Sequence, residues 1–274
     1  MNKQFNKTPM ELTDEQAIDA IYGMFGAQRQ PFQMQSVGQY GIVNPGAKDF
    51  GGTLLKLNRK TRTREDEQNH VAMADIIDRD YADHDAELLD KLSDWSRFAI
   101  ILPDYASAPA TVGYFLGEFG GEITFHERPD YQAIHLHTNY KSVNLEFQFH
   151  SQKHAELKKA TDIFYHEYNN IPLNVNSLID DERKALEQKM IEYCQTVYRH
   201  SDFNQYLPAV KEVVAEYQHR THGRNVQGPK LKHFCQYARK AEMVQNELAE
   251  SLVPFLARLN QMDQIKFDSA KTNI

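Results

Sequence analysis

A strict alternation of apolar and polar residues in the middle of the chain constrains the fold more than any other feature. Between residues 143 and 150, Leu145, Phe147 and Phe149 alternate with polar residues, and residues 122–126 and 131–138 repeat the pattern. Successive side chains of a strand point to opposite faces, so each segment is predicted to be a strand with one core-facing side. The connection at residues 139–142 predicts that the last two strands pair as a hairpin.

The sequence around these strands reads as helices and loops. Thr13 and Gln16 have the spacing of a capping box, which marks the start of a helix. Ser107 is expected to be the N-cap of a second helix that ends at Gly120 and Gly121. The other expected elements are loop or short irregular strands at 31–52, a helix at 65–92, a buried strand at 97–102, and helices from 153 onward with breaks near Pro172, Pro208 and residues 223–229.

These elements predict an α+β fold. We expect a mixed sheet of about five strands with flanking helices and a helical C-terminal extension. Residues 1–170 would form the sheet-containing domain and residues 171–274 the extension. The two cysteines lie far apart and form no CxxC pair, so we expect small core residues rather than a disulfide or a thiolate metal site.

The polar side of the predicted hairpin has an unusual composition. If the two strands pair, one face carries Tyr131, His135, Glu146, Gln148 and His150. A solvent-exposed outer face is the simple interpretation, and it stays open at this point. Such faces, however, usually carry Lys, Glu, Thr and Ser. A face of this composition suits a groove that stacks a base, coordinates a metal and transfers a proton.

These segments resemble the synthetase domains of the RelA/SpoT family. Residues 131–135 resemble the family's GY(R/K)(A/S)(I/L)H segment, and residues 145–148 are similar to the first part of its (V/L)E(I/L)Q…(R/H)T strand. Residues 94–97 are similar to the D-x-x-R variant of the family's Asp-containing motif, and residues 153–168 fit the helix that follows in that variant. Order and spacing agree over residues 45–168.

The resemblance implies a RelA/SpoT-like nucleotidyltransferase fold and an ATP-dependent pyrophosphokinase. Such an enzyme moves pyrophosphate from ATP to a ribose hydroxyl. In the family, an Asp and a Glu hold Mg²⁺ and help to activate the acceptor hydroxyl. Carried over, Asp94 and Glu146 hold the ion and Arg97 clamps a phosphate, so these three are the expected catalytic residues.

The resemblance also implies how the substrates bind. Tyr131 would stack on the acceptor base, while His135 and Gln148 would orient phosphates or ribose. His150 is expected in the same site, since it follows the Glu-containing motif.

The ATP-binding segment of the family reads roughly R-x-K-x-x-x-S-x-x-x-K. Lys48, Thr53 and Lys56 match it only with a shifted spacing, and Gly46 stands where the first arginine belongs. Either Arg59 or a neighbouring basic residue substitutes, or ATP use is impaired. A basic surface helix is the alternative interpretation of this segment.

Two further patterns keep other interpretations open. His135 and His137 share a strand face and lie near His150 and His154 in the sequence, which could indicate zinc, although no HExxH or cysteine-containing ligand set exists. Residues 219–240 carry six Lys and Arg, no acidic residue and two aromatics. This segment could contact RNA or nucleotide phosphates, or it could be a lysine-rich surface.

The chain resembles the small single-domain synthetases, including growth-inhibiting toxins. In that group the acceptor is a guanine nucleotide such as GDP or GTP, an adenine nucleotide, or the 3′ end of tRNA, and an antitoxin or a phage-derived protein could be a partner. The net charge of −7 argues against coating nucleic acid by bulk attraction. No secretory signal or membrane span is expected, which predicts a cytoplasmic protein. A catalytically degenerate nucleotide- or partner-binding protein and a metal-dependent hydrolase are the alternatives.

Overall fold

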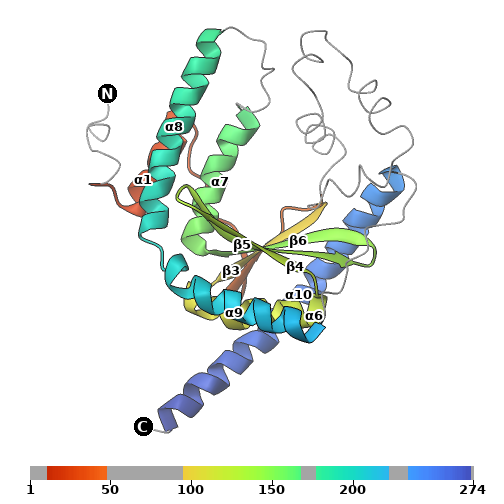
Figure 1. Cartoon of the computed structure of the whole chain (residues 1–274). Coiled ribbons are helices and arrows are strands. Elements are labelled where there is room, and N and C mark those ends of the chain that lie inside the picture. Colours follow the sequence, from red (N-terminus) through yellow and green to blue (C-terminus); the bar gives the residue numbers. More distant parts are fainter. Residues whose placement is uncertain (1–10, 48–94, 168–176, 222–233, 273–274) are drawn as a thin grey trace.

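A six-stranded mixed sheet forms the centre of the protein (Figure 1). The computed structural model describes residues 11–47, 95–167, 177–221 and 234–272. The strands are β1 Gln35–Val37, β2 Tyr40–Val43, β3 Ser96–Leu102, β4 Glu122–Arg128, β5 Tyr131–Tyr140 and β6 Val143–Ser151. They lie in the order β1-β2-β3-β6-β5-β4, with β3 and β6 parallel and the other neighbours antiparallel. The prediction of an α+β fold with a mixed sheet is confirmed.

Helices cover both faces of this sheet. They are α1 Asp14–Met24, the 3-10 turn η3 Tyr105–Ser107, α6 Ala108–Phe119, α7 Gln152–Glu167, α8 Ser177–Arg199, α9 Phe203–Thr221 and α10 Phe234–Thr272. Figure 1 shows α1, α7 and α8 on one side of the sheet and α6 and α9 on the other. None of the helices in these described ranges is both long and apolar enough to cross a bilayer.

The two helix starts predicted from capping residues have different outcomes. At α1, Thr13 and Gln16 bond to each other's backbone N–H, so the capping box is confirmed. At α6, Ser107 is the N-cap residue as predicted, but its side chain makes no capping hydrogen bond. Instead, Asp104 accepts a hydrogen bond from the backbone N–H of Ser107 and caps the short turn η3. The side chain of Asp104 therefore caps η3, and α6 begins directly after this turn, at Ala108.

The helix break expected near Pro208 is wrong. Pro208 lies inside α9, and the chain instead turns just before Phe203, where Ser201 Oγ accepts a hydrogen bond from the Phe203 N–H. A proline removes one intrahelical hydrogen bond. The burial of Leu207 and Val210 in the main core offsets that loss, because the apolar stripe of α9 continues through the proline.

One sheet face and the helices beneath it form the main hydrophobic core. The alternate strand residues predicted to face inward are buried there, and the core also contains residues of α6, α9 and α10. Phe115 of α6 meets Phe147 and Phe149 edge-on at 5.0 and 5.1 Å between ring centroids. From α10, Leu252 and Phe255 complete the layer. The C-terminal helices therefore share the core of the strands that precede them.

The long helix α10 also ties the edge of the sheet to the C-terminal part of the chain. Asn260 Oδ1 accepts a hydrogen bond from the Gln39 N–H at 3.1 Å, and the Tyr40 hydroxyl donates to Asp263 at 2.6 Å. Nearer its start, Gln245 donates to the carbonyl of Arg97 at 2.9 Å. These contacts hold β1, β2 and β3 against one helix.

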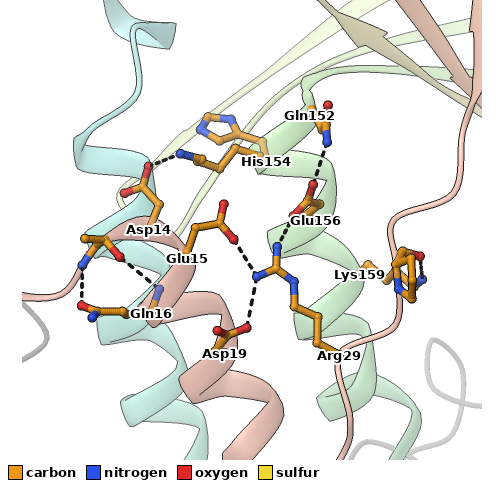
Figure 2. Close-up of polar contacts among 12 residues, drawn as sticks. Asp14, Glu15, Gln16, Asp19, Arg29, Gln152, His154, Glu156 and Lys159 are labelled. Atoms are coloured by element: carbon orange, nitrogen blue, oxygen red, sulfur yellow. Dashed lines mark hydrogen bonds and ion pairs between the residues drawn. The ribbon is translucent and has the colours of Figure 1, made fainter. Parts of the chain in front are cut away.

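Helices α1, α7 and α8 form a second apolar cluster that covers part of the opposite sheet face. Cys194 of α8 is buried in it, as expected for a small core residue. A cluster of charges around Arg29 joins α1 to α7 (Figure 2). The Arg29 guanidinium bonds Glu15 at 2.6 Å and Asp19 at 3.1 Å on α1, and Glu156 on α7. This clamp fixes the position of α7 over the sheet.

The hairpin between β5 and β6 turns more tightly than predicted. Lys141 and Ser142 alone form the turn, with φ of 52° and 64°, and Tyr140 pairs with Val143. Two central residues with positive φ are typical of the type I′ turns that match the twist of paired strands. The predicted four-residue connection is therefore wrong, and the pairing register of the two strands changes with it.

Candidate functional site

The polar residues of β3, β5 and β6 lie side by side on the sheet face beneath α7 and α8. In the observed register His135 is opposite Gln148 and His137 is opposite Glu146. On the other side of β6, Arg97 of β3 is the parallel neighbour of Glu146. The prediction that the polar side chains of the hairpin share one face is confirmed.

Three of these side chains converge on one point. His135 Nδ1 lies 3.7 Å from Glu146 Oε2, and His137 Nδ1 lies 3.6 Å from the same oxygen. One ligand-capable atom from each residue lies within 4.8 Å of the other two. The whole Glu146 residue is 7% exposed, and its side chain is 9% exposed. The cluster is thus a nearly buried carboxylate between two imidazoles.

Hydrogen bonds from neighbouring side chains orient this cluster. Gln148 Nε2 donates to Glu146 Oε1, which leaves Oε2 directed at the histidines. The Tyr131 hydroxyl is hydrogen-bonded to His135 Nε2 at 3.0 Å, which leaves Nδ1 directed at the carboxylate. Two predicted site residues therefore hold two others in position.

Burial keeps several imidazoles of this region neutral. It lowers the pKa of His135 to about 2, with smaller contributions from His126, His137 and two nearby cations. Burial also lowers the pKa of His150 well below its usual value. Neither ring nitrogen of His150 has a hydrogen-bond partner among the described residues. Neutral imidazoles keep a lone pair that can accept a proton or bind a metal.

Two cavities flank this polar face, and both are lined by Lys158 and Asp162 of α7. The first, of about 180 Å³, is also lined by Arg97, Gln148 and His150. Its remaining lining residues include Lys159 and the apolar side chains Phe32, Val43 and Pro45. An apolar wall with a few cations suits a ligand that carries both a flat ring and phosphate.

The second cavity, of about 240 Å³, lies beside the start of β5. Tyr131 lines it together with Arg128, Asp130 and residues of α7 and α8. The guanidinium of Arg128 lies 5.8 Å from the centre of the Tyr131 ring. The sequence interpretation gave Tyr131 the role of stacking on an acceptor base.

Charge is distributed unevenly around the first cavity. Lys158 forms an ion pair with Asp162 at 3.1 Å. In the described part of the chain, no carboxylate lies within 4.0 Å of the Arg97 guanidinium. Arg97 is thus available to an anionic ligand, as its predicted role as a phosphate clamp requires.

Several predicted site residues lie outside the described residues. They are Asp94 and the donor segment residues Lys48, Thr53, Lys56 and Arg59. The expected helix at 65–92 and most of the basic segment at 219–240 lie there too. The structure brings together Arg97, Tyr131, His135, Glu146, Gln148 and His150.

The zinc set considered from the sequence requires correction. His154 does not join His135 and His137. It is hydrogen-bonded to the Tyr105 hydroxyl at 2.8 Å, beneath the first turn of α7. Glu146 takes that place because the two-residue turn sets His137 opposite it, whereas a four-residue connection would have set His135 there. The turn length was the missing signal.

Sequence analysis also missed the contribution of α7. Lys158 and Asp162 lie four residues apart, so both project toward the sheet on one side of the helix. The i, i+4 spacing of Lys158 and Asp162 is visible in the sequence. That the two side chains line both cavities follows only from the position of α7, to which the ion pairs of Arg29 contribute.

The observed donor set can be compared with the ion that the resemblance implies. Mg²⁺ prefers oxygen ligands. The side chain hydrogen-bonded to the Glu146 carboxylate is that of Gln148, which donates through its amide nitrogen. The atoms closest to the free carboxylate oxygen are imidazole nitrogens. The described residues therefore fit Mg²⁺ poorly, and the predicted second carboxylate, Asp94, lies outside them.

Comparison with models of known families, with characterised proteins and with solved structures found no match.

Proposed function

We propose that this protein is a pyrophosphokinase with a RelA/SpoT-like nucleotidyltransferase fold, which transfers pyrophosphate from ATP to a ribose hydroxyl. The observation that carries the proposal is that Arg97 and Glu146 are neighbours in register on the parallel strands β3 and β6, beside a cavity lined by Arg97, Lys158 and Lys159. A transferring phosphate chain needs cations around it and a proton acceptor for the attacking hydroxyl. These residues supply both.

The proposed step needs few groups. The ribose hydroxyl oxygen forms a bond to the β-phosphorus of ATP, and the bond from that phosphorus to the oxygen bridging the α-phosphate breaks. AMP leaves with the electron pair of that bond, and the Glu146 carboxylate takes the proton of the hydroxyl. Arg97 and Lys158 stabilise the charge that moves between the oxygens. Mg²⁺, bound with the ATP phosphates, would supply further charge neutralisation.

The two cavities suggest how the substrates divide. The cation-lined cavity beside Arg97 suits the phosphates of ATP, and the cavity beside Tyr131 suits the acceptor base. Both share Lys158, so the two ligands would meet there. The acceptor is proposed to be a guanine or adenine nucleotide, which would make the product an alarmone, or the 3′ end of tRNA. A toxin role with an antitoxin or phage-derived partner is part of the same proposal.

A panel of acceptors tests the proposal. ATP labelled in the γ-phosphate is incubated with the protein, Mg²⁺ and GDP, GTP, AMP, ADP, ATP or bulk tRNA. We expect label on one acceptor class together with release of AMP. Arg97→Gln should remove this transfer, while Lys211→Gln, which changes a surface cation paired with Glu127, should keep it.

Two other results would overturn the proposal. Release of labelled phosphate or pyrophosphate without transfer would indicate a metal-dependent hydrolase, for which the cluster of His135, His137 and Glu146 is the supporting observation. Binding of nucleotide with neither reaction would indicate a degenerate binding protein.

A further inference from the structure

The cluster of His135, His137 and Glu146 has the geometry of a metal-binding site. Two ligands about 2.1 Å from one tetrahedral ion lie roughly 3.4 Å apart. The two imidazole nitrogens lie 3.7 and 3.6 Å from Glu146 Oε2. The ligand atoms of the two imidazoles lie within 4.8 Å of each other, so side-chain rotations can bring all three atoms onto one ion.

The ligand atoms come from a rigid part of the fold. His135 and His137 are two residues apart on β5, so both point to the same face, and Glu146 is held opposite His137 by the β5–β6 ladder. Metal sites built on paired strands need little rearrangement when the ion binds.

Outer hydrogen bonds support the same interpretation. Histidines that bind metals usually donate their other ring N–H to a neighbouring acceptor, which fixes the tautomer. Here the Tyr131 hydroxyl takes that position at His135 Nε2. Gln148 likewise holds Oε1 of Glu146. Because Tyr131 lines one cavity and Gln148 the other, each cavity reaches the cluster through one residue.

The cluster also lacks a compensating charge. Within the described ranges no Lys or Arg lies within 4.0 Å of the Glu146 carboxylate, although the residue is 7% exposed. A buried carboxylate is unfavourable unless a cation or several hydrogen bonds balance it. The Nδ1 atom of His137 is buried and has no hydrogen-bond partner among the described residues.

The chemistry of the three ligands selects the ion. Two imidazoles and one carboxylate form a set that binds zinc and related transition ions, with a further coordination position left open. We infer that His135, His137 and Glu146 form a binding site for a divalent transition-metal ion of the zinc class. The side chain of His137 is 29% exposed, which provides a path for the ion to enter.

Metal binding by the resting protein tests the inference. The full chain is purified without a polyhistidine tag, stripped with a chelator and titrated with Zn²⁺ or Co²⁺ in competition with a chromophoric chelator. We expect one equivalent of tightly bound ion and a rise in the melting temperature, because an ion that binds the folded state stabilises it. A millimolar excess of Mg²⁺ should not displace it.

Variants identify the ligands. His137→Ala, at the most exposed ligand, should weaken binding by at least ~100-fold, since loss of an outer-shell partner alone weakens metal sites about 10–100-fold. Glu146→Gln should do the same. The matched control is His126→Asn, which removes an imidazole that packs 4.4 Å from His135 on the same face but is not part of the cluster.

Three outcomes would overturn the inference. They are the absence of a stoichiometric ion, displacement by Mg²⁺, and equal loss of binding in the control and the ligand variants. The inference goes beyond the proposed function and does not depend on it. Zn²⁺ binding is measured without nucleotides, whereas pyrophosphate transfer is measured with Mg²⁺ and ATP, so either can fail while the other holds.

Discussion

The two faces of the sheet are built from alternate residues of the same strands, yet they differ in almost every physical property. On one face Phe147 and Phe149 are fully buried against α6 and α10. On the other, Glu146 and Gln148 are nearly as buried, but among polar side chains and beside two cavities. Burial alone therefore does not distinguish core from site. The difference lies in whether each buried group is satisfied by packing or by a specific partner.

The largest expected effect is chemical and concerns the polar face. Glu146→Gln keeps the shape of the side chain but removes the proposed proton acceptor. Proton transfer by a positioned side chain contributes about 10²–10⁴-fold to a rate, so kcat/KM for pyrophosphate transfer should fall by that amount. Asp94→Asn is expected to have a similar effect. Thermal melting should show a folded protein, and full activity in Glu146→Gln would contradict the assignment.

Adjacent residues on β6 test whether the two faces have different roles in stability. Phe147→Ala should lower the free energy of unfolding by about 3–5 kcal/mol, because it leaves a cavity among three other rings. Gln148→Ala removes one hydrogen bond and should lower it by about 1 kcal/mol. Urea denaturation measures both. Equal losses in the two variants would show that the polar face carries as much of the stability as the core does.

The polar side should also make stability depend on pH. Burial lowers the pKa of His154 to about 4, whereas the unfolded chain titrates near 6.5. As the pH falls below 6.5 the unfolded chain takes up one more proton at this position, so His154 alone should lower stability by roughly 1.4 kcal/mol per pH unit down to pH 4. His135 and His150 add to this slope in the same direction. His154→Phe should make this slope shallower by one proton. An unchanged slope would mean that His154 is not a buried neutral ring.

A smaller effect is expected at the mouth of the acceptor cavity. Stacking of a base on an aromatic ring contributes roughly 1–3 kcal/mol. Tyr131→Ala should therefore lower kcat/KM for the acceptor by about one to two orders of magnitude. Tyr131→Phe should keep most of the activity. If the two variants behave alike, the hydroxyl that bonds His135, rather than the ring, is the functional group.

The smallest effect concerns the turn that sets the register of the polar face. Ser142 has a φ of 64°, which favours glycine. Ser142→Gly should raise the free energy of unfolding by about 0.5–1 kcal/mol without changing transfer. The paired variant Ser142→Val should lower it, because a β-branched residue is strained at positive φ.

Periodicity predicted most of the fold because it depends on local sequence. The three alternating strands and the capping box at Thr13 were identified from spacing alone. The break at Pro208 was wrong since the packing of Leu207 and Val210 outweighs one lost hydrogen bond. Propensity describes a segment in isolation, and tertiary contacts can override it.

The site was less accessible to sequence reasoning. The shared face of His135, Glu146 and Gln148 follows from strand alternation. Which imidazole lies opposite Glu146 depends on whether the hairpin turns in two residues or four, and Lys141 and Ser142 gave no glycine or asparagine signal for a tight turn. The position of Lys158 depends on an ion cluster assembled from α1, α7 and the segment between α1 and β1.

The contacts between α10 and the sheet edge have a consequence for the order of folding. The β5–β6 hairpin closes a loop of two residues, whereas the bonds from Gln39 and Tyr40 to Asn260 and Asp263 join residues 221 to 224 positions apart. The entropy lost in closing a loop grows with its length, so local pairs form before distant ones. We therefore expect the β5–β6 hairpin to form early and the contacts of β1 and β2 with α10 to form among the last.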